Sequence, residues 1–399
     1  MSNKIVVASL SLWLAFSPLG LLSQNAPNDI NYNFLALDKN QIENGTAALD
    51  NFFAKLYDIS ETKKGQAVIL HIGDSHVEAE HFPAAVRAGL QHVFGDAGHG
   101  LIKPKFPKRF AYKKRVWYVA TSLEKPQAVN FLDFKVGLKE DDPAQGFNRL
   151  VFFHEKGAQY LDFQIFDMEL HLLATVRASL ATRSPDITMV NLPGTYREVR
   201  LRTVKSKKSQ KYAQIYGISL ENSASGVLYH SYGIVGGSTE SYIRSPYFQK
   251  QLETLQPDLV IISLGTNDAS GVKLNEDVFA ANLSALLSEI QAVCPQSAVI
   301  LTTAAESYRR PTRRGKQIVN PNIPAIQNSI LQLGQKMHFS IWDFFSIMGG
   351  LGSMKLWQRN ALASYDLIHF TKEGYQLQGK LLCEALLNGF RTYAKTRTS

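Results

Sequence analysis

The chain has 399 residues, of which 45% are hydrophobic and 19% are charged, and its formal net charge is +9. This hydrophobic content is sufficient for one large domain or two smaller ones, and it excludes a disordered or fibrous protein. The sequence has no CxxC motif and no cluster of Cys and His, so a structural zinc site has no support. Cys294 and Cys383 each lie in an apolar, helix-like stretch, which favours two buried thiols over the alternative of one disulfide.

The first residues have the pattern of a secretory signal peptide. Lys4 precedes a mostly apolar run over residues 5–22, and small and polar residues follow. Pro18 and Gly20 near the end of this run favour cleavage over an uncleaved anchor helix, so we expect residues 1–23 to be removed. No later segment is apolar for long enough to cross a bilayer, which predicts a soluble, exported mature protein, either secreted or periplasmic.

Residues 66–104 have the pattern of a buried strand followed by a helix. The run QAVILHI, at residues 66–72, is apolar almost throughout, as in strands buried on both faces of a parallel sheet. A helix is predicted for residues 77–94, because apolar residues recur there on one stripe, at Phe82, Val86, Leu90 and Val93. We expect residues 24–65 to pack on this unit as an N-terminal segment.

After residue 105 the pattern changes to short runs with a period of two. In DFKVGL, LDFQIF and REVRLRTV apolar and polar residues alternate, and turn-forming segments separate the runs. We therefore predict a β-rich insert at residues 105–225. This segment holds 20 Lys and Arg against 12 Asp and Glu, a net charge of +8, which favours an anionic polymer or surface as partner. A solvated basic face without a partner is the alternative.

The α/β pattern resumes at residue 226. Further strands are predicted at 226–234, 258–265, 297–304 and 339–345, and helices at 239–255, 277–293, 324–337 and 372–393. This alternation predicts an α/β fold with a doubly wound, mainly parallel, five-stranded sheet. Residues 66–104 and 226–399 would form this one discontinuous domain, and its site would lie at the carboxyl ends of the strands.

Two of the predicted strands end in polar stretches suited to acyl transfer. The first strand runs into GDSH, where Ser75 would stand beside the backbone N–H groups and helix dipole that stabilise negative charge. By itself, Asp-Ser is equally an ordinary helix N-cap. The strand at 258–265 runs into GTND, where the amide of Asn267 could donate to a developing oxyanion.

A third stretch, DLIH, follows near the end of the chain. Asp366 and His369 are three residues apart, so a carboxylate can hydrogen-bond an imidazole within one turn, fix its tautomer and support the imidazolium. The three stretches together supply a nucleophile, a base, an orienting group and an oxyanion donor. A metal-dependent phosphodiesterase using Asp74, His76 and Asp268 would leave the Asp-His pair unexplained.

Other catalytic classes lack their characteristic loops. The sequence has no G-x-S-x-G elbow, no Walker A loop and no G-x-G-x-x-G after a strand, which argues against α/β-hydrolases, P-loop enzymes and dinucleotide-binding enzymes. We expect no cofactor and no metal.

In order and in strand context, GDSH, GTND and DLIH resemble the sequence blocks of the SGNH (GDSL-type) hydrolase superfamily. The resemblance implies the flavodoxin-like fold of that superfamily and a carboxylic ester hydrolase. It implies Ser75 as nucleophile, His369 as general base and Asp366 as the group that orients it.

The resemblance also implies an oxyanion hole made from the Ser75 backbone N–H, the Asn267 side chain and a glycine N–H. In YGIVGGST, Gly236 aligns best with that glycine, and Gly233 and Gly237 are the alternatives. Val235 stands where relatives often have Asn, so this loop departs from the family pattern.

The insert and its flanks, FGDAGHGLIKP and GISLENSASGVLYHSYGIVGG, resemble bacterial peptidoglycan O-acetylesterases, in which a carbohydrate-binding-like β module interrupts the hydrolase. This resemblance implies an antiparallel β-sandwich at residues 105–225 and an O-acetylated cell-wall glycan as substrate, with no nucleic acid partner. An acetyl xylan-type esterase, another carbohydrate or lipid esterase, and a non-catalytic glycan-binding protein on the same fold are the alternatives.

Five further residues are candidates for substrate binding, each with a structural alternative. Asp74 and His76 flank the nucleophile, where packing is an equal explanation. Arg309 and Arg310 follow the fourth strand and could contact an anionic group, or lie in a solvated loop. Trp357 follows a glycine-rich segment and could cover a sugar, or pack in the core.

Overall fold

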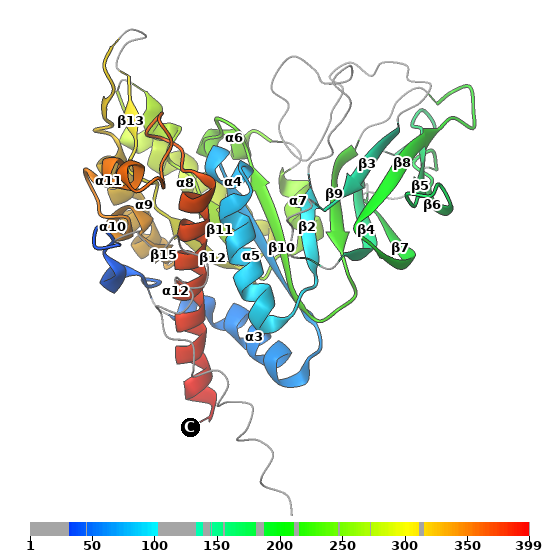
Figure 1. The fold of residues 1–399 in the computed structure, drawn as a ribbon, viewed down its shortest axis with the longest axis horizontal. Coiled ribbons are helices and arrows are strands. Elements are labelled where there is room, and N and C mark those ends of the chain that lie inside the picture. The colour runs from blue at the N-terminus through cyan, green and yellow to red at the C-terminus, as the bar shows by residue number, and fades with distance from the viewer. Residues whose placement is uncertain are drawn as a thin grey trace, which may run out of the picture.

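A computed structural model describes residues 32–398, apart from 45, 103–132, 139–143, 145, 155, 181–186, 211–214, 246–247, 272 and 311–314. The expected signal peptide, residues 1–23, lies outside the described part. A parallel sheet with helices on both faces forms one part of the molecule, and antiparallel sheets lie beside it (Figure 1). Among the described residues, no helix is both long enough and apolar enough to cross a membrane.

The central sheet has five parallel strands in the order β10-β1-β11-β12-β15. Their bounds are β1 Gln66–Gly73, β10 Gly226–Gly233, β11 Leu259–Ser263, β12 Ala298–Thr302 and β15 Ser340–Trp342. Numbered by their sequence order within the sheet, the strands run 2-1-3-4-5, the flavodoxin-like order of a doubly wound sheet. The predicted fold class is therefore confirmed.

Helices cover both faces of this sheet (Figure 1). One layer contains α3 Asp50–Thr62, α5 His81–Phe94 and α12 Lys372–Thr398. The other contains α7 Phe248–Leu255, α8 Glu276–Val293 and α9 Ile323–Met337. Short helices at the loops are α4 Ser75–Glu78, α6 Thr239–Ile243, α10 Phe344–Ile347 and α11 Ser353–Arg359. Cys294 and Cys383 are both buried, free thiols, as the sequence predicts.

The second part of the molecule is a β-sandwich of two antiparallel four-stranded sheets that enclose one core. The first sheet contains β2 Gly98–Ile102, β9 Ile215–Glu221, β4 Phe147–His154 and β7 Ile187–Tyr196. The second contains β3 Asp133–Gly137, β8 Glu198–Val204, β5 Asp162–Phe166 and β6 Leu172–Val176. β2 lies before residue 105, so the first sheet includes residues from outside the predicted insert range.

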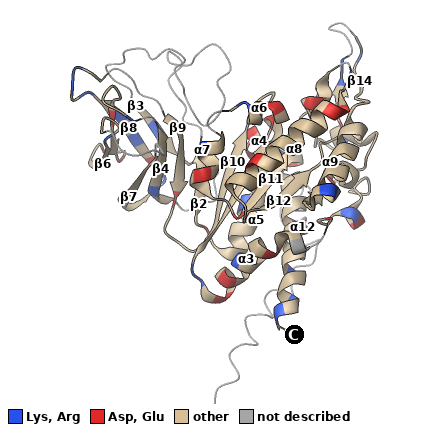
Figure 2. Ribbon diagram, turned by 180° about the vertical axis from the view of Figure 1, so that it is seen from behind, with Lys and Arg blue, Asp and Glu red and all other residues tan. Residues whose placement is uncertain are grey.

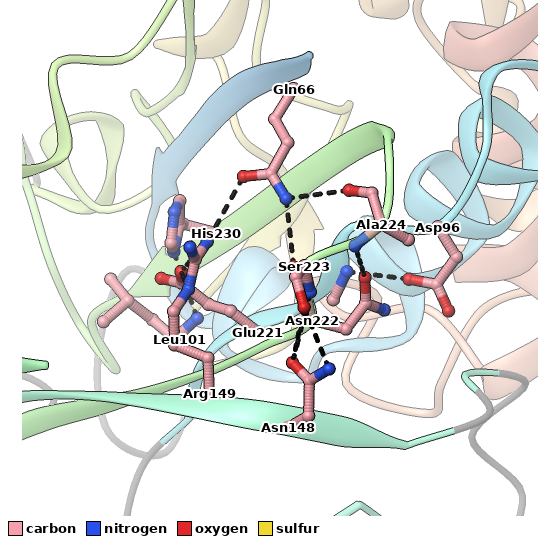
Figure 3. Close-up of polar contacts among 11 residues, drawn as sticks. Gln66, Asp96, Leu101, Asn148, Arg149, Glu221, Asn222, Ser223, Ala224 and His230 are labelled. Carbon is pink, nitrogen blue, oxygen red and sulfur yellow. Dashed lines mark hydrogen bonds and ion pairs between the residues drawn. The ribbon is translucent and has the colours of Figure 1, made fainter. Parts of the chain in front are cut away.

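The sandwich is joined to the central sheet by a polar network that is only partly buried (Figure 3). Arg149 on β4 forms an ion pair with Glu221 on β9 at 2.7 Å, and it also donates to the side chain of Gln66 at 3.3 Å. The Gln66 amide in turn donates to the carbonyl oxygens of Asn222 and Ala224. Because Gln66 begins the central strand β1, this network connects the two sheets directly.

Two predicted helices are interrupted. The helix predicted for residues 77–94 is divided into α4 and α5, because Glu80 between them has a left-handed backbone with a φ of 70°. The helix predicted for residues 239–255 is divided into α6 and α7. Pro246 lies between these two in the sequence, and proline disfavours a helical conformation in the residue before it.

The strand predicted for residues 339–345 is shorter than the sequence indicates. It ends at Trp342, because Asp343 acts as the N-cap of α10 and accepts a hydrogen bond from the backbone N–H of Ser346. Asp343 also accepts a hydrogen bond from the hydroxyl of Thr303 at 2.8 Å. The apolar residues after Trp342 therefore enter a helix rather than the sheet.

We predict that Arg149→Ala lowers the free energy of unfolding by about 2 kcal/mol, because it leaves the nearly buried Glu221 carboxylate without its ion pair. Urea denaturation would measure this. Lys135→Ala, which removes the exposed pair with Glu198, is the control and should cost less than about 1 kcal/mol. If the free energy of unfolding fell equally in the two variants, the Arg149–Glu221 pair would stabilise the protein no more than an exposed ion pair does.

Candidate active site

Three loops leave the central sheet at the same edge. In the parallel register, Gly73 at the end of β1 lies opposite Gly233 on β10 and Ser263 on β11. The segments that follow these residues contain Ser75, Gly236 and Asn267 respectively. The topology thus brings the three stretches singled out in the sequence to one place.

Ser75 is the first residue of α4, and Asp74 is its N-cap. The Asp74 carboxylate accepts a hydrogen bond from the His76 backbone N–H at 2.9 Å, which fixes the sharp turn from strand to helix. The Ser75 side chain is partly exposed, and its Oγ lies 2.9 Å from Nε2 of His369. The structure therefore brings the predicted nucleophile and base into hydrogen-bond contact.

His369 is held by Asp366 on its other nitrogen. Nδ1 of His369 lies 2.7 Å from one carboxylate oxygen of Asp366, and the second oxygen accepts the backbone N–H groups of Ile368 and His369. Partial burial alone would raise the pKa of Asp366, but these hydrogen bonds outweigh it and hold the pKa below its usual value. Asp366 therefore stays ionised and keeps the proton of the neutral imidazole on Nδ1, leaving Nε2 free to accept from Ser75.

The loop that carries this pair is fixed by its backbone. Leu367 has a left-handed φ of 56°, and the side chain of Gln317 donates to the Asp366 carbonyl at 2.8 Å. The backbone N–H of Ser364 donates to the carbonyl of His369, also at 2.8 Å. These contacts close the turn, and the closed turn fixes how Asp366 and His369 lie relative to each other.

Three N–H groups are predicted to form the oxyanion hole, from Ser75, Gly236 and Asn267. Within the described residues, the backbone N–H groups of Ser75 and Gly236 make no hydrogen bond, whereas that of Gly237 donates to Ile234. Gly236 has a φ of 71°, a conformation that favours glycine. One N–H of the Asn267 amide donates to the Gly237 carbonyl at 2.9 Å, and the other has no partner in the described part of the chain. Gly236 is thus better suited than Gly237 to donate.

Two carboxylates close to each other, the buried Asp74 and the partly buried Asp268, lie next to this site. Burial raises the pKa of Asp74 to about 6 and also raises the pKa of Asp268. Asp268 accepts two hydrogen bonds from Thr239, from its backbone N–H at 3.2 Å and from its hydroxyl at 2.8 Å. Asp268 therefore ties the GTND turn to the start of α6. Within the described residues, no three His, Cys, Asp or Glu side chains are grouped to hold a metal ion.

The remaining substrate-binding candidates differ in position. Arg310 is exposed, whereas Arg309 is partly buried and donates to the carbonyl of Gly271 at 2.5 Å. Contact of either arginine with substrate stays a prediction. Trp357 is 0% exposed, packs on Phe370 with ring centroids 4.8 Å apart and cannot cover a sugar. The expectation of a sugar-binding Trp357 is corrected: its large apolar ring belongs to the core.

The sequence reading missed two side chains that organise the site. Thr239 binds Asp268, and the hydroxyl of Tyr375 lies 3.1 Å from Nδ1 of His76. Tyr375 is in the first turn of α12, which begins directly after the loop of His369. The sequence carries no signal for either contact, because each joins two segments that are separate along the chain.

Comparison with known proteins agrees with this geometry. The model of the GDSL-like Lipase/Acylhydrolase family matches residues 204–377, which include Asn267, Asp366 and His369, while Ser75 lies on the other side of the insert. A search of curated protein sequences finds no significant match. The match over residues 204–377 confirms the resemblance predicted from the sequence, and it supports an esterase.

One solved structure shares the fold over most of this chain. The structure described as "Peptidoglycan O-acetylesterase in action, 5 min" matches 88% of this chain and 99% of its own, with a TM-score of 0.68 and 20% identity. A GDSL-like lipase from Bacteroides thetaiotaomicron matches 40% of this chain and 75% of its own (TM-score 0.31, 22% identity). A carbohydrate esterase family 3 protein from Talaromyces cellulolyticus matches 40% and 72% (TM-score 0.31, 17% identity). At 20% identity, the first of these structures shows a shared fold.

The raised pKa of Asp74 makes stability depend on pH. Below about pH 4 the group is protonated in both the folded and the unfolded chain, and between pH 4 and 6 only the unfolded chain releases the proton. This carboxyl group therefore contributes stability at low pH that is lost as the pH rises through 6. For a shift from 3.8 to about 6, the loss is about 3 kcal/mol.

We predict that Asp74→Asn removes this dependence. Between pH 4 and pH 7, the free energy of unfolding of the wild type should fall by about 3 kcal/mol relative to that of the variant. Urea denaturation at the two pH values measures the difference. Asp58→Asn, at an exposed position of α3, is the control, and a similar change in both variants would contradict the assignment.

Proposed function

We propose that this protein is an exported serine esterase that removes O-acetyl groups from a cell-envelope polysaccharide, above all peptidoglycan. The observation that carries the proposal is the continuous hydrogen-bonded chain from Ser75 through His369 to Asp366, with contacts of 2.9 and 2.7 Å. The fold shared with a peptidoglycan O-acetylesterase, over nearly the whole of that chain, supports the choice of substrate.

In the first half of the reaction, Oγ of Ser75 attacks the acetyl carbonyl carbon while Nε2 of His369 takes its proton. Asp366 stabilises the imidazolium that forms. The negative oxygen of the tetrahedral intermediate would accept hydrogen bonds from the N–H groups of Ser75, Gly236 and Asn267. The intermediate then breaks the bond between the carbonyl carbon and the sugar oxygen, and Nε2–H of His369 protonates that oxygen.

The second half releases acetate. Nε2 of His369 takes a proton from a water molecule, which attacks the carbonyl carbon of the acetyl-Ser75 ester. A second tetrahedral intermediate forms and loses Oγ of Ser75, which takes the proton back from His369. The products are acetate and the free enzyme, and no cofactor is consumed.

The charge of the insert supports an anionic polymer only in part. Figure 2 shows Lys and Arg on β3, β4 and β8. On β3 and β8 several of these are neutralised, because Arg200 and Arg202 bind Asp133 and Lys135 binds Glu198. Much of the excess positive charge, including all Lys and Arg between residues 105 and 125, lies outside the described residues. The proposal that the insert attracts an anionic glycan is therefore based on the charge of its sequence.

Ser75→Ala should lower the hydrolysis of a chromogenic acetyl ester by at least about 10⁴-fold, because the nucleophile is lost while the surrounding N–H groups remain. Rates would be measured on protein whose circular dichroism matches the wild type. Ser60→Ala, on the distant helix α3, should keep full activity. An active Ser75→Ala enzyme would end the assignment of the mechanism.

Acetate release from isolated wall material tests the substrate. We expect acetate from O-acetylated peptidoglycan, none from chemically de-acetylated peptidoglycan, and slower release from acetylated xylan. Enzymatic assay of free acetate provides the measurement. Faster release from xylan would favour the plant-polysaccharide alternative, and no release from any polymer by a wild-type protein active on small esters would reject a glycan substrate.

A further inference from the structure

His76 directly follows the nucleophile, and the mechanism above gives it no role. Its side chain is only 6% exposed, although an imidazole is polar. Nδ1 lies 3.1 Å from the Tyr375 hydroxyl, and Nε2 has no hydrogen-bond partner in the described part of the chain. A histidine buried at this cost, beside the predicted nucleophile and base, requires an explanation.

The contact with Tyr375 fixes the His76 ring. The Tyr375 hydroxyl can donate its proton to Nδ1 of His76, 3.1 Å away. This donation satisfies the hydroxyl and Nδ1, and it places the proton of the neutral imidazole on Nε2. The Tyr375 ring also packs on the ring of Phe370, the residue after His369, with centroids 5.4 Å apart, so Tyr375 connects the His76 ring to the loop of His369.

The His76 ring also lies against His369. The two ring centroids are 5.2 Å apart with an interplanar angle of 31°, and the Phe370 ring lies 5.8 Å from that of His76. The His369 side chain is 38% exposed, so the contact with His76 restrains it on the protein side while the rest remains open to substrate. Rotation of the His369 ring away from Ser75 is thereby opposed.

We propose that His76 is a positioning residue that holds the imidazole of His369 in line with Ser75, and that Tyr375 locks it in place. The proposal rests on the proposed function only in that His369 acts as the base for Ser75. In this arrangement His76, the residue after the nucleophile, sets the position of His369, although His76 and His369 are far apart in the sequence.

The charge of His76 suits this task. The titratable groups near it are His369, Asp366, Asp74 and Tyr375. Burial and the positive charge of protonated His369 lower the pKa of His76 to about 3, so its ring stays neutral. A neutral ring does not repel the imidazolium formed during catalysis, and its polarisable face can stabilise that cation.

The kinetic test uses His76→Ala and Tyr375→Phe with a small acetyl ester as substrate. We expect kcat to fall by about 10- to 100-fold in His76→Ala and less in Tyr375→Phe, with KM changed by less than about twofold, because the base is displaced while substrate contacts remain. Tyr229→Phe is the matched control. It removes a similar buried contact, 2.8 Å from the Tyr229 hydroxyl to Nδ1 of His71, and should leave kcat unchanged.

Double variants separate positioning from a general structural effect. In a His369→Ala background, whose residual rate is measured with an activated aryl acetate, His76→Ala should cost nothing further, because its effect passes through His369. The low-field proton resonance of His369 Nδ1–H should also shift or broaden in His76→Ala and in Tyr375→Phe, and not in Tyr229→Phe.

Three results would overturn the inference: a wild-type kcat in folded His76→Ala, the same loss with and without His369, or a kcat loss in Tyr229→Phe equal to that in Tyr375→Phe. If His76→Ala does not fold, Tyr375→Phe alone decides, since it removes one hydroxyl. An inactive Ser75→Ala together with a fully active His76→Ala would reject this inference and leave the proposed function intact.

Discussion

The site depends on the close approach of α4 to the ends of two parallel strands. A Cβ atom on Gly73 would lie 2.3 Å from a methyl carbon of Val77 in α4, and one on Gly233 would lie 2.1 Å from the backbone nitrogen of Glu78 in the same helix. Only glycine allows such contacts. Because α4 begins this close to the sheet, the backbone N–H of Ser75 and the loop of Gly236 are held at the same edge.

Burial shifts the pKa values of several groups around the site. It raises the pKa values of Asp74 and Asp268 and lowers that of His76. Asp366, by contrast, is kept ionised by its hydrogen bonds. When the proposed base His369 gains a proton, the Asp366 carboxylate is in direct contact with the new charge, and the neutral ring of His76 adds no second cation.

The five strands of the central sheet and the residues at their ends were predictable from the sequence, because strands buried on both faces form continuous apolar runs and the polar stretches after them stand out. Strand β4 was not predicted. Its Leu150 and Phe152 pack inside the sandwich, while Val151 and Phe153 pack against the hydrolase core. Both faces are therefore apolar, and the alternation expected of an antiparallel strand is absent.

The side-chain contacts of the site could not be derived in the same way. The pairing of His76 with Tyr375 joins residues 299 positions apart, and neither residue type indicates such a partner. The division of α4 from α5 depends on the left-handed backbone of Glu80, whose carboxylate binds Arg87 and Ser231. A tertiary contact stabilises a conformation there that local propensity disfavours.

The first sheet of the insert also covers an edge of the central sheet. β10 is the outermost strand of the central sheet, and unpaired edge strands promote aggregation. The chain before β2 pairs with this edge at Val227, and β2 continues alongside β10, where the Leu101 backbone N–H donates to the ring of His230 (Figures 1 and 3). The junction at Gln66 lies at the start of β1, whereas Ser75 follows its end. The described part of the sandwich therefore covers the edge of the sheet, and its junction at Gln66 lies at the opposite end of β1 from Ser75.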